Sequence, residues 1–240
     1  VGGVCAERGL PALGLGDGRE ARATGGGGVE VLTPHGRYAG LSLVLRGAHQ
    51  RDNLACAIAG AELVAGGALD AGAVRAAVAA VEVPGRMEVL PGRPEIILDG
   101  AHNPAGMQAL VEALAEVLGD RGPVTAVVSV LGDKRALEMV AALAGVADLV
   151  FTTRSSHARA IDAVELAGLA GDAGVAAWAV ADPRQALAEA RAAAAPDGVV
   201  VVTGSLYLLA DLRPGLVRAA TEPPATLARA RKGTDPTEAK

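Results

Sequence analysis

One stretch of sequence, EIILDGAHNP at residues 95–104, indicates the fold of this chain most clearly. Three apolar residues run into Asp99, and Pro104 stands where a helix can begin. A short apolar strand followed by a helix then recurs along the chain. Strands are predicted at about 95–99, 124–130, 148–153, 175–180 and 199–202, and helices at about 104–118, 134–143, 162–170, 183–194 and 205–212.

Continuous apolar strands that alternate with helices are typical of a parallel sheet buried on both faces. Right-handed crossovers between such strands give a doubly wound arrangement. We therefore predict an α/β fold for residues 84–213, a Rossmann-like, mostly parallel sheet with helices on both faces. The many alanines of the helices suit this fold, because small side chains let a helix approach the sheet closely.

The sequence before this domain has a different character. Apolar runs at 29–32 and 38–45 predict antiparallel strands, so residues 1–46 resemble the β-rich edge of an incomplete domain. Residues 47–83 predict two linker helices, at 49–66 and at 70–81, with Asp70 as an N-cap. Residues 214–240 carry four prolines among charged residues and predict a flexible tail.

Composition narrows the class of protein. The chain has 240 residues, of which 51% are hydrophobic and 20% are charged, which excludes a disordered protein. A net charge of −5 and 2% aromatic residues argue against nucleic-acid binding. The sequence contains no transmembrane segment or signal peptide, so we expect a cytoplasmic protein without a membrane partner. Cys5 and Cys56 are too few for a disulfide framework and are expected to be small buried residues.

Ligands of open α/β sheets bind where strands end, so the residues after each strand are the candidates for a site. After the first strand stand Asp99, His102 and Asn103. A carboxylate there can bind a ribose hydroxyl or a metal-bound water, and the imidazole can hold a substrate carboxylate or phosphate. The alternative is that Asp99 and Asn103 only form the turn and cap the helix.

Later loops add further candidates. Asp133 and Lys134 follow the second strand, Arg159 lies in the loop after the third, and Ser205 and Tyr207 follow the last. Arginine and lysine at such loops suit anionic substrates, and Gly204 would let Ser205 and a helix N-terminus face an anion. A capped helix with solvated side chains explains the same residues equally well.

Two candidates precede the sheet, and several common motifs are absent. Asn53 stands near a helix start, and Arg86 lies in a turn that leads into a short strand. Helix capping and a surface turn are their plain alternatives. The chain has no phosphate-binding loop of the form GxxxxGK[ST], no GxGxxG at the first helix, no GxSxG and no HExxH.

Taken in order, these segments resemble a known family. The motifs HQRDNLACAIA at 49–59, PGRME at 84–88 and DGAHNP at 99–104 are similar to those of folylpolyglutamate synthase/dihydrofolate synthase enzymes, in the Mur ligase superfamily. GDK at 132–134, RA at 159–160 and GSLY at 204–207 agree with the same family. The resemblance covers about residues 28–213.

The resemblance implies an ATP-dependent ligase that adds L-glutamate to a folate or dihydropteroate carboxylate through an acyl phosphate. It implies that Asn53, Arg86 and Asp99 bind ATP, and that His102 and Ser205 bind glutamate, with Asn103, Asp133, Lys134, Arg159 and Tyr207 as further possible contacts. Residues 1–46 match the last strands of the family's central ATP-binding domain. Its phosphate-binding loop and magnesium ligands lie amino-terminal to the region matched here, so no metal ligand and no catalytic residue is assigned on this chain.

We therefore expect half of an active site on this chain, which by itself is predicted to be inactive. The full-length protein is expected to be a monomer that uses ATP and Mg²⁺. Two alternatives stay open: another Mur-type ligase that adds an amino acid to a peptidoglycan precursor, and a non-catalytic Rossmann-like binding module.

Overall fold

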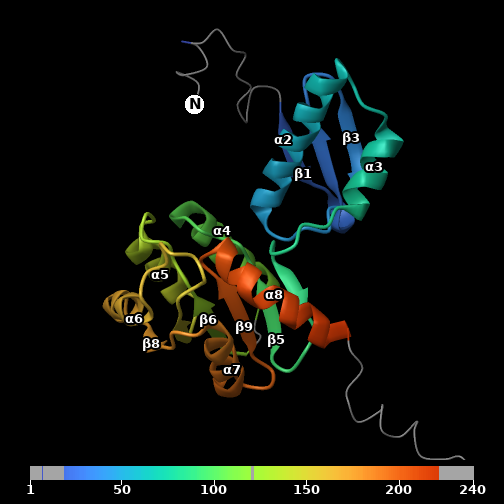
Figure 1. The fold of residues 1–240 in the computed structure, drawn as a ribbon. Helices are drawn as coiled ribbons and strands as arrows, with labels where there is room; N and C mark the ends of the chain where they lie inside the picture. Colours follow the sequence, from blue (N-terminus) through green and yellow to red (C-terminus); the bar gives the residue numbers. More distant parts are fainter. Residues whose placement is uncertain (1–6, 8–18, 120–121, 222–240) are drawn as a thin grey trace, which may run out of the picture. The chain divides into compact units, whose positions relative to one another are not determined.

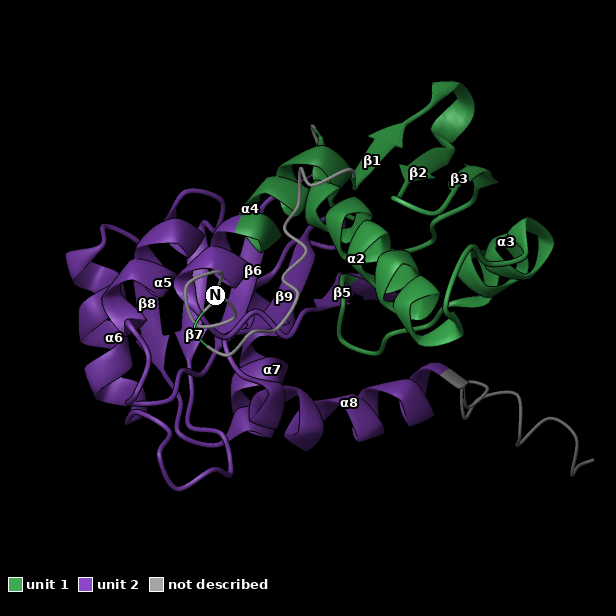
Figure 2. Ribbon diagram, turned by 90° about the horizontal axis from the view of Figure 1, so that it is seen from above, with its two compact units in different colours: residues 1–87, 109–119 green, residues 88–108, 120–240 purple. Residues whose placement is uncertain are grey.

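The structure, a computed structural model, describes Glu7, residues 19–119 and residues 122–221. These residues contain nine strands and seven α-helices (Figure 1). They divide into two compact units, shown in green and purple in Figure 2. Unit 1 comprises residues 1–87 and 109–119, and unit 2 comprises residues 88–108 and 120–240. The expected division at residues 46, 83 and 213 differs from these units and stays a prediction.

Unit 1 is built on a small antiparallel sheet. Its strands β1 (Glu20–Ala23), β2 (Val29–Leu32) and β3 (Arg37–Leu41) pair in sequence order, and a 3₁₀ turn (Gly25–Gly27) joins the first two. Helices α2 (Ala48–Ala65) and α3 (Ala71–Ala80) share one apolar core with β2 and β3. Asp70 caps α3 as predicted, because its Oδ1 accepts the Ala73 N–H at 2.7 Å.

A buried carboxylate joins the helices of unit 1 to its sheet. Glu62 of α2 is 0% exposed. Its Oε1 accepts hydrogen bonds from the hydroxyls of Thr33 and Tyr38, each at 2.7 Å. The Tyr38 hydroxyl accepts in turn the Leu69 N–H at 2.8 Å. Because a buried carboxylate is costly without partners, this network fixes α2 in one register against the sheet.

Unit 2 contains a six-stranded sheet in the order β4-β5-β9-β6-β7-β8. Strand β4 pairs antiparallel with β5, and the other four pairings are parallel. The strands are β4 (Glu88–Leu90), β5 (Glu95–Leu98), β6 (Val124–Val128), β7 (Leu149–Thr152), β8 (Ala176–Ala179) and β9 (Val199–Thr203). The helices that alternate with them are α4 (Pro104–Leu118), α5 (Ala136–Ala144), α6 (Ala163–Asp172), α7 (Pro183–Ala193) and α8 (Leu206–Thr221). Residues 109–118 of α4 are grouped with unit 1.

Alternate residues of these strands point to opposite faces of the sheet, and both faces are covered. Leu98, Val127, Phe151 and Val202 belong to one apolar cluster with residues of α7 and α8. On the other face Thr152 donates to a carbonyl of α6 at 2.7 Å. The predicted Rossmann-like α/β architecture, a mostly parallel sheet between helices, is confirmed (Figures 1 and 2).

Two sequence expectations are wrong. Residues 214–221 are not tail but the last turns of α8, which continues through Pro214; residues 222–240 of the predicted tail lie outside the described residues. Cys56 is exposed rather than buried, because it stands on the side of α2 that faces away from the core. Cys5 lies outside the described residues. In the described parts of the chain, no helix combines the length and apolar character needed to cross a membrane.

Candidate functional site

The carboxyl edge of the unit 2 sheet gathers the loops in which the sequence predicts a site. Strand β9 lies between β5 and β6, so the loops after these three strands are neighbours although they are far apart in the sequence. The Asp99 N–H donates to the Val202 carbonyl at 3.0 Å, and the Ser129 N–H donates to that of Thr203 at 3.3 Å. These two bonds extend the hydrogen bonding of the sheet beyond the strand ends, so the loops after β5, β9 and β6 lie side by side.

Gly204 allows the last strand to turn closely past its neighbour. Its φ is +94°, and a Cβ at this position would lie 2.5 Å from the Ser129 carbonyl oxygen. Only glycine fits such a backbone approach. The turn places Ser205 at the start of α8, where its buried Oγ accepts the Tyr207 N–H at 3.1 Å. The predicted helix N-terminus at this loop therefore depends on glycine at position 204, because the turn leaves no room for a side chain there.

The loop after β5 is held by its own polar groups. Asp99 is 6% exposed, and its Oδ1 accepts the Ala101 N–H at 2.8 Å. His102 is half-buried, and its Nδ1 lies 2.8 Å from the Gly100 carbonyl oxygen. Because a carbonyl oxygen can only accept, the Nδ1 of His102 donates in this contact. Asn103 is exposed and caps α4 through the Gly106 N–H at 2.8 Å.

An ion-paired cluster follows β6. Asp133 lies 3.2 Å from the Lys134 ammonium and 3.1 Å from the Arg159 guanidinium. The hydrogen bond from Lys134 is the main reason that the pKa of Asp133 lies below its usual value, and the charge of Arg159 adds to the shift. Asp133 thus holds two cations at this loop. Lys134 precedes α5, which begins at Ala136 rather than at the predicted residue 134.

Four of the predicted residues line one small cavity in unit 2. His102, Lys134, Ser205 and Tyr207 surround a space of about 130 Å³ together with Leu131, Gly204 and Leu206. The cavity thus combines a cation, an imidazole and a helix N-terminus. This set suits a small anion with a hydrogen-bonding group, such as an amino acid. Asp133 and Arg159 do not line the cavity, but they are linked to Lys134 because Asp133 forms ion pairs with both Lys134 and Arg159.

The two remaining candidates meet in unit 1. Asn53 and Arg86 line one groove of about 470 Å³, whose other lining residues are apolar except Gln50. The Asn53 amide donates to the Gln50 side chain at 3.1 Å, and Gln50 contacts His49 Nε2 at 2.9 Å. An apolar groove that presents an amide and a guanidinium can hold an aromatic base and a phosphate.

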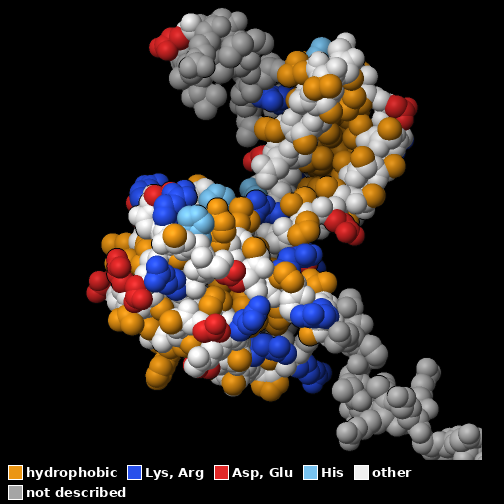
Figure 3. Space-filling view, viewed as in Figure 1, with side chains coloured by type: hydrophobic (Ala, Val, Ile, Leu, Met, Phe, Trp, Pro, Cys, Tyr) orange, Lys and Arg blue, Asp and Glu red, His pale blue; other side chains and the backbone are white. Residues whose placement is uncertain are grey.

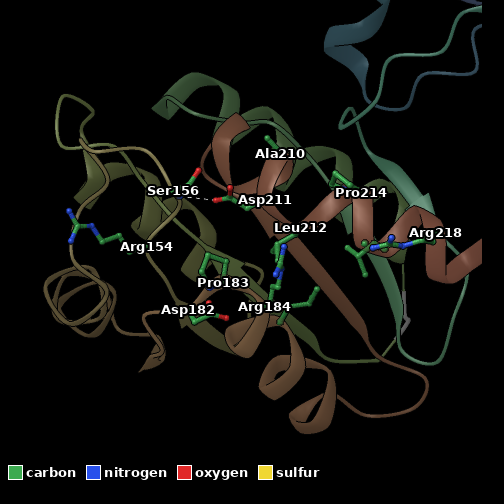
Figure 4. Close-up of a pocket in the computed structure, with 13 residues that line it drawn as sticks. Arg154, Ser156, Asp182, Pro183, Arg184, Ala210, Asp211, Leu212, Pro214 and Arg218 are labelled. Carbon is green, nitrogen blue, oxygen red and sulfur yellow. Dashed lines mark hydrogen bonds between the residues drawn. The ribbon is translucent and has the colours of Figure 1, made fainter.

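A third cavity lies between the start of α7 and the second half of α8 (Figure 4). It measures about 800 Å³, and none of the predicted site residues lines it. Asp211 accepts the Ser156 N–H at 2.8 Å, and Asp182 accepts the Gln185 N–H at 2.8 Å. Arg154 and Arg218 lie at opposite ends of the view in Figure 4. Asp211 and Asp182 thus fix a loop and cap α7, and we assign no site to this cavity.

A family model settles the class of the chain. The model described as "Mur ligase, glutamate ligase domain" matches residues 85–206, which is half of the sequence. The chain belongs to the Mur ligase family. The matched region begins just before β4 and ends at the start of α8, so it contains every strand of the unit 2 sheet and all the lining residues of the small cavity except Tyr207.

Relatives of this Mur ligase chain bear consistent names. It is 37% identical over 158 residues to dihydrofolate synthase/folylpolyglutamate synthase of Mycobacterium tuberculosis, a match that covers 64% of this chain and 32% of that protein. It matches the structure of M. tuberculosis folylpolyglutamate synthase complexed with ADP and AMPPCP with a TM-score of 0.68 at 33% identity, over 91% of this chain and 48% of the other. It also matches the structure of bifunctional folylpolyglutamate synthase/dihydrofolate synthase from Yersinia pestis complexed with AMPPNP and Mn. The TM-score is 0.72 at 27% identity, and the match covers 90% of this chain and 50% of the other.

The chain therefore spans about half, or less, of the length of these relatives. The resemblance seen in the motifs is confirmed at the level of the family.

The sequence did not assign a role to two residues in the loops at this edge of the sheet, His157 and Ser129. The His157 ring packs on Tyr207, with ring centroids 4.2 Å apart. Ser129 is fully buried and accepts the Ser155 N–H at 3.0 Å, which holds the neighbouring loop. The polar character of both residues is visible in the sequence, but their partners lie 50 and 26 residues away, beyond any local pattern.

Proposed function

We propose that this chain is the glutamate-binding part of an ATP-dependent ligase that joins L-glutamate to a carboxylate of folate or dihydropteroate. The observation that carries the proposal is the small cavity, where four residues predicted from three separate motifs converge. The names of the relatives supply the substrate class, and the family supplies the reaction type. On this proposal ATP first phosphorylates the acceptor carboxylate, and the glutamate amine then displaces phosphate.

In this mechanism the cavity binds the incoming glutamate. The Lys134 ammonium, held by Asp133, pairs with a glutamate carboxylate, and Ser205 with the first N–H groups of α8 supports the same negative charge. The ring of His102 is oriented by the contact of its Nδ1 with the Gly100 carbonyl, so its other nitrogen, Nε2, is assigned to the amine. The residues thus position the nucleophile, and positioning is a large part of such a reaction.

The ATP contacts implied by the resemblance are Asn53, Arg86 and Asp99, and the groove of unit 1 supports the first two. The apolar walls suit adenine, the Asn53 amide suits its polar edge, and Arg86 suits a phosphate. Asp99 would accept a ribose hydroxyl. Among the residues that the structure describes, no group of three or more His, Cys, Asp or Glu side chains is placed to hold a metal ion. No step on this chain is derived through a metal.

Binding of glutamate by the chain itself tests the glutamate site. We expect millimolar L-glutamate to shift the amide resonances of residues 100–103, 131–134 and 204–207 in ¹⁵N NMR spectra, and L-leucine to leave them unchanged. Lys134→Met is expected to abolish the shifts. Arg135→Met, next in sequence but paired with Glu138 on the exposed side of α5, should leave them intact. Equal shifts with both amino acids would exclude a glutamate site.

A ligase assay tests the prediction that the chain by itself is inactive. The chain alone, with ATP, L-glutamate and tetrahydrofolate, is expected to release no ADP above background, because the sequence contains no phosphate-binding loop. Folate-dependent release of ADP by the chain alone would overturn the claim that it is inactive without a further ATP-binding part.

A further inference from the structure

The loop after β7 contains a histidine, His157, that packs on a wall of the small cavity from outside it. The centroids of the His157 and Tyr207 rings lie 4.2 Å apart, with an angle of 42° between the rings. Tyr207 lines the cavity, whereas His157 does not. Contact between tilted rings is favourable, so the imidazole favours one position of the Tyr207 ring. His157 is thus placed to act on the cavity through Tyr207.

The imidazole is itself held by the backbone of its loop. Its Nδ1 accepts the Arg159 N–H at 3.1 Å, a bond to the residue two positions on that resembles the turn made by asparagine. The carbonyl of His157 accepts the Ala160 N–H at 2.9 Å. The preceding residue is fixed as well, because the Ser156 N–H donates to Asp211 at 2.8 Å (Figure 4). The ring therefore stands on a defined stretch of backbone.

Two neighbouring residues of this loop hold two residues that lie one turn apart on α8. Ser156 donates to Asp211, and His157 packs on Tyr207. Positions four apart share one side of a helix, so both contacts fall on the same side of α8. The start of this helix, with Ser205 before it, lines the cavity. The loop therefore fixes the part of α8 on which the cavity depends.

The same loop also reaches the cation of the cavity. The Arg159 guanidinium lies 3.1 Å from Asp133, and Asp133 lies 3.2 Å from the Lys134 ammonium. The Gly132 N–H donates to the Arg159 carbonyl at 2.8 Å. Figure 3 shows Lys or Arg side chains beside His side chains at the upper left of unit 2. The loop thus connects Lys134 to Tyr207, two residues that line the same space.

We propose that His157 is a positioning residue that sets the selectivity of the cavity for L-glutamate over L-aspartate. The two amino acids carry the same charged groups and differ by one methylene, so a fixed distance between the cavity walls is what separates them. The ring contact of His157 holds Tyr207 relative to Lys134 and supplies such a distance. This inference rests on the proposed function, because the ligand of the cavity is taken from it.

Binding of both amino acids to the 240-residue chain tests the proposal. Titrations followed in ¹⁵N NMR spectra give the dissociation constants for L-glutamate and L-aspartate from the amide resonances of residues 131–134. We expect the parent to prefer glutamate. His157→Ala should reduce this preference about three- to ten-fold, which is the factor that corresponds to one aromatic pair.

Two further variants separate the ring from the turn. His157→Phe keeps a ring for Tyr207 but has no acceptor for the Arg159 N–H, so its preference should stay within about two-fold of that of the parent. His157→Asn keeps an acceptor but has no ring, so it should behave like His157→Ala. The opposite order would overturn the proposal, because the turn would then set the selectivity. His35→Ala, at an exposed histidine of unit 1, is the control and should match the parent.

The tyrosine rings give a measurement that needs no ligand. The sequence contains two tyrosines, Tyr38 and Tyr207, so the chain labelled with 3-fluorotyrosine should give two ¹⁹F signals. His157→Ala is expected to move the Tyr207 signal and to leave that of Tyr38 in place. The amide resonances of the unit 2 strands should also stay in place, whereas a general loss of structure would move them. A Tyr207 signal that does not respond would refute the positioning role.

The outcomes separate this inference from the proposed function. Glutamate binding by the parent, together with an unchanged preference in His157→Ala, would refute the role of His157 and leave the function standing. A parent that binds both amino acids equally would refute the selectivity alone. A parent that binds neither would refute the proposed glutamate site, and this inference with it.

Discussion

At the scale of single residues, Gly204 shows how closely the site depends on backbone geometry. Both its φ of +94° and the 2.5 Å approach of a Cβ to the Ser129 carbonyl oppose any side chain. We expect Gly204→Ala to lower the free energy of unfolding of unit 2 by about 2–4 kcal/mol in urea titrations. Gly174→Ala, with a φ of +86° but open space, should cost only about 1 kcal/mol. Equal losses would mean that the close approach is unimportant.

Tyr38 gives a prediction about pH. Burial, followed by the hydrogen bond to the Glu62 carboxylate, raises the pKa of Tyr38 above its ordinary value. A raised folded pKa means that its contribution to stability is complete below about pH 10 and is lost as the pH rises further. We therefore expect the free energy of unfolding of unit 1 to fall more steeply above pH 10 in the parent than in Tyr38→Phe.

Tyr38→Phe also removes a donor and an acceptor from the buried network. At pH 8 it should destabilise unit 1 by about 1–3 kcal/mol, because Glu62 loses one of its hydroxyl donors and the Leu69 N–H loses its acceptor. Urea unfolding at pH 8 and pH 10.5 gives both numbers. The same pH slope in both proteins would show that Tyr38 does not titrate as described.

At the scale of elements, one ion pair ties α8 to the edge strand β4. The Arg213 guanidinium donates two hydrogen bonds to the Glu88 carboxylate, at 2.8 and 2.9 Å, and these bonds raise the pKa of Arg213. The pair is partly buried, with side chains 33% and 20% exposed. We expect Arg213→Met to destabilise unit 2 by about 1 kcal/mol. Arg22→Met, which breaks an exposed pair with Glu20, should have no measurable effect on unit 1.

A double-mutant cycle with Glu88→Gln checks that the loss comes from this pair. The two single changes should be less than additive, by about 0.5–1 kcal/mol. Full additivity would assign the loss to packing of the arginine stem instead of the pairing.

At the scale of the whole molecule, each unit has its own apolar core. We expect two resolvable unfolding transitions by calorimetry, since units with separate cores unfold separately. Tyr38→Phe should move only one of them and Gly204→Ala only the other. A single transition that both variants shift equally would show that the two cores unfold as one cooperative body.

Much of the fold can be predicted from local patterns. The helix at 104–118, the N-cap at Asp70 and the five predicted strands of unit 2 follow from periodicity and capping, and the structure has them at those places. Strand β8 differs in being largely exposed, because it lies at the edge of the sheet. The predicted end of α8 comes too early, because Pro214 has the character of a helix breaker. Packing of Leu212 and Leu216 against the sheet carries the helix past it.

Local sequence also points to some residues of the candidate site but not to the contacts between them. Residue types at strand ends are enough to point to Asp99, His102, Lys134 and Ser205. Asn103 caps α4 and Asp99 accepts a hydrogen bond within its own turn, so both residues also have the structural roles that the sequence analysis gave as the alternative. The stacking of His157 on Tyr207 has no local signal, because it joins loops that follow different strands.

The alternation of strands and helices, the helix caps and the family follow from the sequence alone, because these depend on neighbours along the chain. The packed fold was needed to place β9 between β5 and β6, which brings the loops of His102, Lys134 and Ser205 around one cavity. It was needed also to show that α2 buries Glu62 and exposes Val64. Strand order and burial are set by pairings between distant segments, and these form when apolar surfaces pack together and buried polar groups find partners.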